Sequence, residues 1–181
     1  MWWQTRPGRE PAERDRFIAE TEDEFGPWGK IYREDDRVIG LIQYGPAAAF
    51  PRAATMPAGP PARDAVVITC AYLTDVNSPW VLQSLVLAAI GECNDRGWPA
   101  LEGFGYRYAQ GEPFPTRFLR HRTIFPQDFL ADFGFLPTRV SGRVQLMRLD
   151  LRTLESSPEA SRLERIKSRL AVLQPTPAPV R

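Results

Sequence analysis

The stretch from Ala65 to Gly97 contains a predicted strand, turn and helix in direct succession. It reads AVVITCAYL over 65–73, TDVNSP over 74–79 and WVLQSLVLAAIGECNDRG over 80–97. A run rich in Val, Ile and Tyr predicts a buried strand, and the Ser78-Pro79 pair is typical of a helix start. A helix that begins just beyond a strand end offers free backbone N–H groups and a positive dipole end. Phosphates and other anions bind at such places.

The segment before this stretch predicts one helix, one hairpin and a long loop. Arg9–Phe25 has apolar residues at helical spacing, and Gly26-Pro27 ends the pattern. Lys30–Arg33 and Val38–Tyr44 are expected to form an antiparallel hairpin around a tight turn. Ala47–Asp64 contains several prolines, which can continue neither a sheet ladder nor a helix, so we expect a long loop there.

Further elements are expected after Gly97, which ends the helix. They are a strand over Pro99–Tyr106, an irregular segment over Arg107–Ile124, a short helix over Pro126–Phe133, two strands over Phe135–Val140 and Val144–Leu151, and an amphipathic helix over Pro158–Leu173. The last of these helices has leucines on one side, so it could pack on the domain or pair two copies of the chain.

The order of these elements predicts an α/β (α+β) fold in which helices flank a mixed central sheet. The strand at 65–73 and the strand after the long helix should be parallel neighbours, because a helix joins them. We expect one domain over residues 1–152. Residues 153–181 would then form a C-terminal helical extension with a Pro-rich tail.

Composition limits the kinds of protein that this chain can be. The 181 residues are 43% hydrophobic and 25% charged, which is ordinary for a soluble globular domain. A net charge of +1 gives no reason to expect a nucleic-acid or membrane partner. No apolar run approaches the roughly 20 residues that cross a bilayer, and Met1–Arg6 lacks a signal-peptide layout. We therefore expect a cytoplasmic protein.

Cysteine and histidine usage predicts neither a disulfide nor a metal site. Cys70 and Cys93 fall inside predicted elements, where buried reduced thiols are expected. The single histidine, His121, has no metal-type Cys/His spacing around it, so no zinc site is predicted.

Three features together resemble the GNAT acyltransferases. They are the central strand–turn–helix–strand unit, the short helix that ends in Asp132-Phe-Gly-Phe135, and the Pro-rich stretch Phe50–Pro57. The order of elements over Lys30–Leu151 is similar to the GNAT order, and the likeness is to a poorly characterised subgroup from GC-rich bacteria. The resemblance implies a mixed sheet, acetyl-coenzyme A as cofactor, and a small amine or amino-acid-like acceptor. A homodimer would form through the leucine face of the helix expected at 158–173.

The resemblance also shows where this chain departs from the family at the cofactor loop. The family turn usually reads Arg/Gln-x-x-Gly-x-Gly/Ala, in which the small residues admit the coenzyme A pyrophosphate. The matching positions here are Asn77, Trp80 and Leu82, so both small residues are replaced. Trp80 either points away from the groove or fills it. The positions expected to contact acetyl-coenzyme A are Tyr72, Leu73, Ser78, Trp80, Val81, Leu82 and Gln83.

Acyl transfer to an amine needs a proton acceptor, a proton donor for the thiolate and an amide that polarises the thioester carbonyl. The amide is expected at Tyr72 or Leu73. Glu102, the only carboxylate in the two central strands, is either a general base or a residue that faces outward or pairs with an arginine. Tyr106 and Tyr108 are either proton donors or wall residues of the cleft.

Other candidates have weaker sequence support. Leu130 stands where many family members carry a tyrosine, so a proton donor must come from elsewhere. Phe50 and Met56 are plausible walls of the substrate pocket. His121 lies among the arginines of 117–122, which could contact an acidic substrate or the 3′-phosphate of the coenzyme, or could simply be solvated.

Two functions of different class remain. The first is an acyl-coenzyme A-dependent N-acyltransferase, in which the acceptor amine attacks the thioester directly. The second is a GNAT-like binding or assembly module that has lost coenzyme A binding, which the residues at positions 80, 82 and 130 favour. We take the acyltransferase as the main hypothesis.

Overall fold

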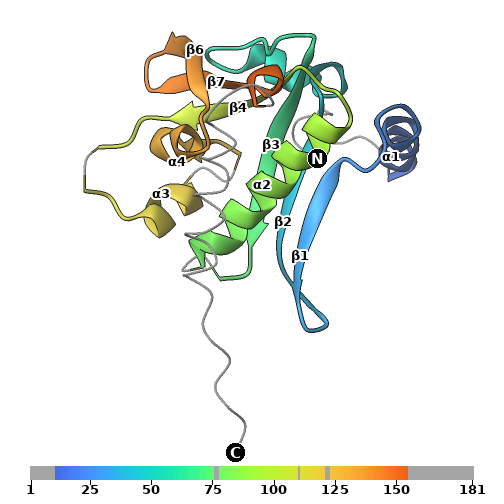
Figure 1. The fold of residues 1–181 in the computed structure, drawn as a ribbon, viewed down its shortest axis with the longest axis horizontal. Coiled ribbons are helices and arrows are strands. Elements are labelled where there is room, and N and C mark those ends of the chain that lie inside the picture. Colours follow the sequence, from blue (N-terminus) through green and yellow to red (C-terminus); the bar gives the residue numbers. More distant parts are fainter. Residues whose placement is uncertain (1–10, 76–77, 110, 121–122, 155–181) are drawn as a thin grey trace, which may run out of the picture.

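The centre of the fold is a mixed seven-stranded sheet (Figure 1). The computed structural model describes residues 11–75, 78–109, 111–120 and 123–154. The strands are β1 (Gly29–Glu34), β2 (Arg37–Pro46), β3 (Ala65–Leu73), β4 (Ala100–Tyr106), β5 (Phe125–Pro126), β6 (Leu136–Ser141) and β7 (Val144–Asp150). Six strands follow the order β1-β2-β3-β4-β7-β6, and the short β5 pairs with β4 beside this path.

The pairing confirms the predicted mixed sheet. β1 and β2 form the expected antiparallel hairpin, and β2 is also antiparallel to β3. β3 and β4 are parallel, because the helix between them carries the chain back to the same end of the sheet. β7 completes the sheet by pairing antiparallel with both β4 and β6.

Helices and 3-10 turns cover the two faces of the sheet. The helices are α1 (Pro11–Phe25), α2 (Pro79–Asp95), α3 (Phe114–Arg120) and α4 (Gln127–Asp132), and the 3-10 turns are η1 (Ala47–Ala49), η2 (Pro51–Thr55) and η3 (Leu151–Thr153). On one face, α2 packs mostly on β1 and β2, while α4 packs on β4 and β7. α1 lies beside β1 at the margin of the molecule (Figure 1).

The hydrophobic core has two parts, one on each face of the sheet. The larger cluster contains the inward side of α2, including Leu82, Leu85 and Val86, and continues into α4. The smaller cluster lies under η1 and η2, where Phe50 and Ala53 pack against strand residues such as Phe104. The Pro-rich segment therefore covers the face of the sheet opposite α2.

One expectation for the connecting segments was wrong. The segment predicted to be irregular, Arg107–Ile124, contains α3, because Phe114 and Phe118 are one helical turn apart and pack on Phe125 and Phe129. Pro115 falls in the first turn of α3, where a proline removes no helical hydrogen bond. The Pro-rich segment is a long connection between β2 and β3, as expected, and it contains the short 3-10 turns η1 and η2.

Some sequence predictions lie outside the described residues or remain predictions. The amphipathic helix expected at 158–173 and the Pro-rich tail lie outside the described residues, so the division into 1–152 and 153–181 stays a prediction. Within the described part of the chain, no helix is both long and apolar enough to span a membrane.

Candidate functional site

The two central parallel strands separate part-way along their length. β3 and β4 pair only over Ala65–Ile68 and Ala100–Gly103. Opposite β2, Gln43 pairs with Cys70 while Tyr44 pairs with Ile68, so Thr69 is an additional residue in β3 at this point. Such a bulge bends the strand. Beyond it, β3 and β4 run apart, as Figure 1 shows, and we call this region the β3–β4 divergence.

The β3–β4 divergence begins at Thr69 and Cys70, the residues at the bulge. Sequence reasoning had assigned the polarising amide to Tyr72 or Leu73, which lie in the unpaired half of β3 but farther from the bulge. The bulge is held by Gln43, whose side-chain oxygen accepts from Thr69 Oγ1 at 3.2 Å and from Cys70 Sγ at 3.4 Å. Gln43 had no signal in the sequence, because its role depends on cross-strand register.

The N-terminus of α2 lies just beyond the end of β3. Ser78 is its N-cap residue, and the Ser78 side chain makes no capping hydrogen bond to the first turn of the helix. The Ser78 hydroxyl instead donates to Asp75 Oδ2 at 3.2 Å. Pro79 has no N–H, and the N–H groups of Ser78 and Val81 donate to the carbonyls of Asp75 and Ser78, so this turn offers an anion chiefly the N–H of Trp80.

Trp80 is directed toward the β1–β2 hairpin. Its indole is half-buried and stands edge-on to the ring of Tyr32 on β1, with the ring centroids 5.3 Å apart. In the strand order β1-β2-β3-β4, this hairpin lies on the side of β3 away from β4. The indole therefore points away from the β3–β4 divergence.

The other residues predicted at the cofactor loop lie on different sides of α2. Val81 and Leu82 are buried in the main core, so their side chains do not line the outer surface of the turn. Gln83 is half-buried. Asn77, matched to the first position of the family motif, lies outside the described residues.

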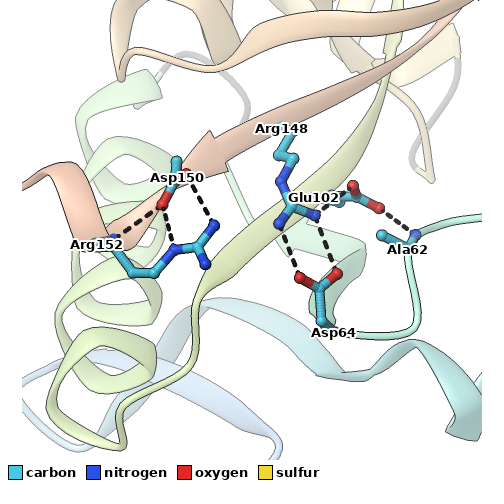
Figure 2. A network of polar contacts seen from close by, with 6 residues as sticks. All are labelled: Ala62, Asp64, Glu102, Arg148, Asp150 and Arg152. Carbon is cyan, nitrogen blue, oxygen red and sulfur yellow. Dashed lines mark hydrogen bonds and ion pairs between the residues drawn. The ribbon is translucent and has the colours of Figure 1, made fainter.

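Glu102 is a fully engaged carboxylate within the paired part of the central strands. Its exposed fraction is 2%, Oε1 accepts from Arg148 at 3.1 Å and Oε2 accepts from the Ala62 backbone N–H at 2.8 Å. Arg148 also binds the carboxylate of Asp64 (Figure 2). Of the two alternatives left open from the sequence, the structure shows the arginine-paired one.

This network fastens the Pro-rich segment to the sheet. Glu102 and Arg148 come from neighbouring strands β4 and β7, whereas Ala62 and Asp64 belong to the end of the Pro-rich segment (Figure 2). A hydrogen bond from Arg148 is the main cause that lowers the pKa of Asp64. No local pattern could identify Arg148 as the partner, because it lies 46 residues from Glu102 along the chain.

A cavity of about 480 Å³ lies at the carboxyl end of β4. Its lining includes Tyr106, Arg107, Tyr108, Glu112, Arg117 and Asp128. The two tyrosine rings are in contact, with centroids 4.7 Å apart. The structure thus brings the two tyrosine candidates together at one cavity.

Two ion pairs shape the wall of this cavity. Arg117 Nη1 binds both oxygens of Asp128, at 2.8 and 2.7 Å, and the Tyr108 hydroxyl donates to the Arg117 carbonyl at 2.8 Å. Arg120 pairs with Glu112 at 3.1 Å. Desolvation is the main cause that raises the pKa of Tyr108. Of the arginines of 117–122, Arg117 and Arg120 are therefore paired with carboxylates, and Arg122 lies outside the described residues.

The remaining candidates are placed apart from this cavity or are not described. Phe50 is completely buried beneath the Pro-rich segment, so it belongs to the core, while Met56 packs at the edge of the same cluster. Leu130 is completely buried. His121 lies outside the described residues. Cys70 and Cys93 are free thiols, and burial is the main cause that raises the pKa of Cys93 to about 12.

Solved structures of acyltransferases resemble this chain at low sequence identity. A proposed acetyltransferase from Staphylococcus aureus Mu50 is 15% identical, with a TM-score of 0.49 over 77% of this chain and 79% of that one. BjaI, a coenzyme A-dependent acyl-homoserine lactone synthase solved with SAM and isopentyl-CoA, is 15% identical, with a TM-score of 0.47 over 81% and 65%. A proposed GNAT-family acetyltransferase from Desulfovibrio desulfuricans is 17% identical, with a TM-score of 0.44 over 80% and 85%.

The matched structures are thus acetyltransferases and an acyl-coenzyme A-dependent synthase, and they include the GNAT family that the sequence resembles. This chain spans 65% of the length of BjaI. No protein-family model matches the sequence, and no curated protein does.

Proposed function

We propose that this protein is an N-acyltransferase that uses an acyl-coenzyme A, with acetyl as the acyl group, and transfers it to a small amine. The observation that carries the proposal is the bulge at Thr69, where β3 leaves β4 and turns toward the uncapped first turn of α2. A separated pair of parallel strands that leads to a free helix N-terminus suits a long ligand with an anionic end.

The residues around α2 fit the diphosphate of the coenzyme. The first turn has no side-chain cap, Leu82 is turned into the core, and Trp80 packs on Tyr32. The large side chains that replace the small family residues therefore leave the backbone of this turn accessible to an anion. The backbone N–H of Trp80 and the positive end of the helix dipole would hold the diphosphate.

When bound, the acyl-coenzyme A supplies a thioester carbonyl, and the acceptor forms a C–N bond there as the C–S bond breaks. We assign the polarisation of this carbonyl to a backbone N–H at Thr69 or Cys70, because the divergence begins at these residues. Tyr106, at the end of β4, is our candidate for donating the proton that the sulfur gains. Glu102 acts as a positioning residue that holds the Pro-rich segment through Ala62.

Calorimetry with acetyl-coenzyme A on the full chain tests the proposal. We expect binding in the micromolar to millimolar range, and an absence of heat at millimolar ligand would defeat the proposal. Ser78→Asp should weaken binding at least about tenfold, because an aspartate at the N-cap places a negative charge where the diphosphate binds. Ala88→Asp, on the exposed side of α2, makes the same charge change and should have little effect.

A non-catalytic binding module is the second candidate function. The engagement of Glu102 with Arg148 and Ala62 favours it, because this leaves no uncommitted carboxylate in the two central strands. Under this alternative, the chain as it stands does not bind acetyl-coenzyme A, and replacing Trp80 and Leu82 together by glycine creates binding. Tight binding by the unaltered chain would reject the alternative.

A further inference from the structure

The cavity at the end of β4 offers one uncompensated cation. Arg117 is neutralised by Asp128 and Arg120 by Glu112. Arg107 also lines this cavity, and its guanidinium makes no ion pair with any residue that the structure describes. The charged groups around the cavity therefore sum to one positive charge, which favours a ligand that carries an anionic group.

Two polar atoms in the wall add specific hydrogen-bonding capacity. Arg117 Nε is buried and donates to no acceptor among the described residues. Glu112 Oε2 is also buried, and although it is 3.1 Å from Arg120, it accepts no hydrogen bond with good geometry from the described part of the chain. A buried donor and a buried acceptor without partners are costly unless a ligand or water completes them.

The position of the cavity connects it to the proposed transfer. Tyr106 ends β4, and it alternates with Glu102 and Phe104, so all three lie on the face opposite α2. The rest of the wall comes from α3 and α4, which share a core cluster with α2, so the cavity lies at the carboxyl end of β4, the end at which β3 and β4 diverge. The rings of Tyr106 and Tyr108 form an apolar wall beside the charged groups.

We infer that the acceptor is an amine that also carries a carboxylate, such as a free α-amino acid, and that Arg107 binds this carboxylate. Glu112 accepts a hydrogen bond from the amine, and Arg117 Nε donates to the acceptor from the same wall. This inference rests on the proposed acyltransferase function, since it assigns the acceptor of that reaction. A guanidinium forms paired hydrogen bonds with a carboxylate, which a lysine ammonium cannot reproduce.

The test measures binding of acceptors to the full chain without coenzyme. Each standard amino acid is titrated by saturation-transfer NMR, and for each that binds, its decarboxylated amine serves as the matched probe. We expect at least one amino acid to bind, and its decarboxylated amine to bind at least about tenfold more weakly, which corresponds to the loss of a charge-assisted interaction. Equal binding of the two probes, or no binding of any amino acid, would overturn the inference.

Variants locate the binding group. Arg107→Ala should weaken amino-acid binding about tenfold without changing the weak binding of the decarboxylated amine, and Arg107→Lys should restore part of the affinity. Arg143→Ala removes another exposed arginine, outside the cavity lining, and should have no effect. An unchanged affinity in Arg107→Ala would reject the role of Arg107. Calorimetry with acetyl-coenzyme A alone tests the acyltransferase proposal separately, so the failure of one is distinguishable from the failure of the other.

Discussion

The indole of Trp80 stands edge-on to the ring of Tyr32, with the two ring planes at 83°. This contact joins the first turn of α2 to β1, the outermost strand on that side of the sheet. Because the indole is used in packing, the most conspicuous departure from the family motif has a structural role. The bulk of residue 80 is therefore compatible with an accessible helix N-terminus.

Replacing Trp80 by alanine should reduce stability and leave coenzyme binding almost unchanged. Because the indole is only half-buried, its removal should destabilise the protein less than removal of a fully buried ring would. We expect a cost of about 1–3 kcal/mol in the free energy of unfolding. Urea denaturation measures this cost, and calorimetry with acetyl-coenzyme A measures binding. A gain of affinity of tenfold or more in the variant would mean that the indole does occlude the site.

The contact itself can be measured by a double-mutant cycle. Tyr32→Ala alone should also destabilise the protein. The double variant Tyr32→Ala/Trp80→Ala should lose less free energy of unfolding than the sum of the losses in the two single variants. The expected coupling is about 0.5–1.5 kcal/mol, the usual worth of an edge-to-face aromatic pair. Strict additivity would contradict the packing described for these rings.

Local pattern was sufficient to predict most of the fold. The strand at 65–73 was predicted with its observed bounds, and the helix that follows it was predicted within two residues at either end. Both have strong periodicity and clear end signals at Ser78-Pro79 and Gly97. α3 was missed; Pro113 precedes it and Pro115 falls in its first turn, where a proline is tolerated.

The site was harder to predict, because its geometry depends on pairing between distant residues. The bulge at Thr69 follows from the register of β2 against β3, and no local pattern encodes that register. Trp80 is adjacent in sequence to the core residues Val81 and Leu82, so helical spacing alone could not tell which strand it would contact. The partner of Glu102 was likewise undetermined until β7 was placed beside β4.

Removal of Arg148 should be much more damaging than neutralisation of Glu102. Arg148→Met leaves a buried carboxylate without its cation, for which we expect a cost of about 3–5 kcal/mol. Glu102→Gln keeps the shape and can still accept from Ala62, so its cost should be about 1–2 kcal/mol. Chemical denaturation of both variants measures the difference.

The same variants distinguish a positioning role for Glu102 from a catalytic one. If Glu102 were the general base, Glu102→Gln would lower kcat by about 10²–10⁴ and change the pH profile of the reaction. We expect instead that kcat falls only modestly, in step with the loss of stability, and that the pH profile of the reaction is unchanged. The double variant Glu102→Gln/Arg148→Met should lose less free energy of unfolding than the sum of the two single losses, because the two residues share one ion pair.

Glu92 should make the stability of the protein depend on pH in the acid range. It accepts from the buried Tyr44 hydroxyl at 2.6 Å and pairs with Lys30 and Arg96. Burial acts to raise the pKa of Glu92, but the hydrogen bonds from Lys30 and Tyr44 and the nearby charges outweigh it, so the pKa is lowered. Its contribution is therefore present above the ordinary glutamate pKa and is lost as the pH falls through the depressed value.

The expected outcome is a free energy of unfolding that declines below about pH 5 in the unaltered chain and declines less in Glu92→Gln. Tyr44→Phe removes one hydrogen bond to the carboxylate, at a cost of about 1.5–3 kcal/mol near neutral pH. Glu24→Gln, an exposed residue of α1, provides the control. Equal acid sensitivity in Glu92→Gln and the unaltered chain would contradict this account.

Phenylalanine substitution should separate the roles of the two tyrosines at the end of β4. The Tyr108 hydroxyl donates to the Arg117 carbonyl, so Tyr108→Phe should cost about 1 kcal/mol of stability and leave kcat nearly unchanged. Tyr106→Phe should lower kcat by about 10²-fold if its hydroxyl gives a proton to the departing sulfur.

An acyl thioester with a more acidic thiol provides the decisive comparison, because such a leaving group needs less help from an acid. The deficit of Tyr106→Phe should shrink with this donor, whereas a deficit caused by misfolding or poor acceptor binding would stay the same. A larger loss of kcat in Tyr108→Phe than in Tyr106→Phe would instead assign the proton donor to Tyr108. That outcome would require the hydroxyl of Tyr108 to leave the Arg117 carbonyl during turnover.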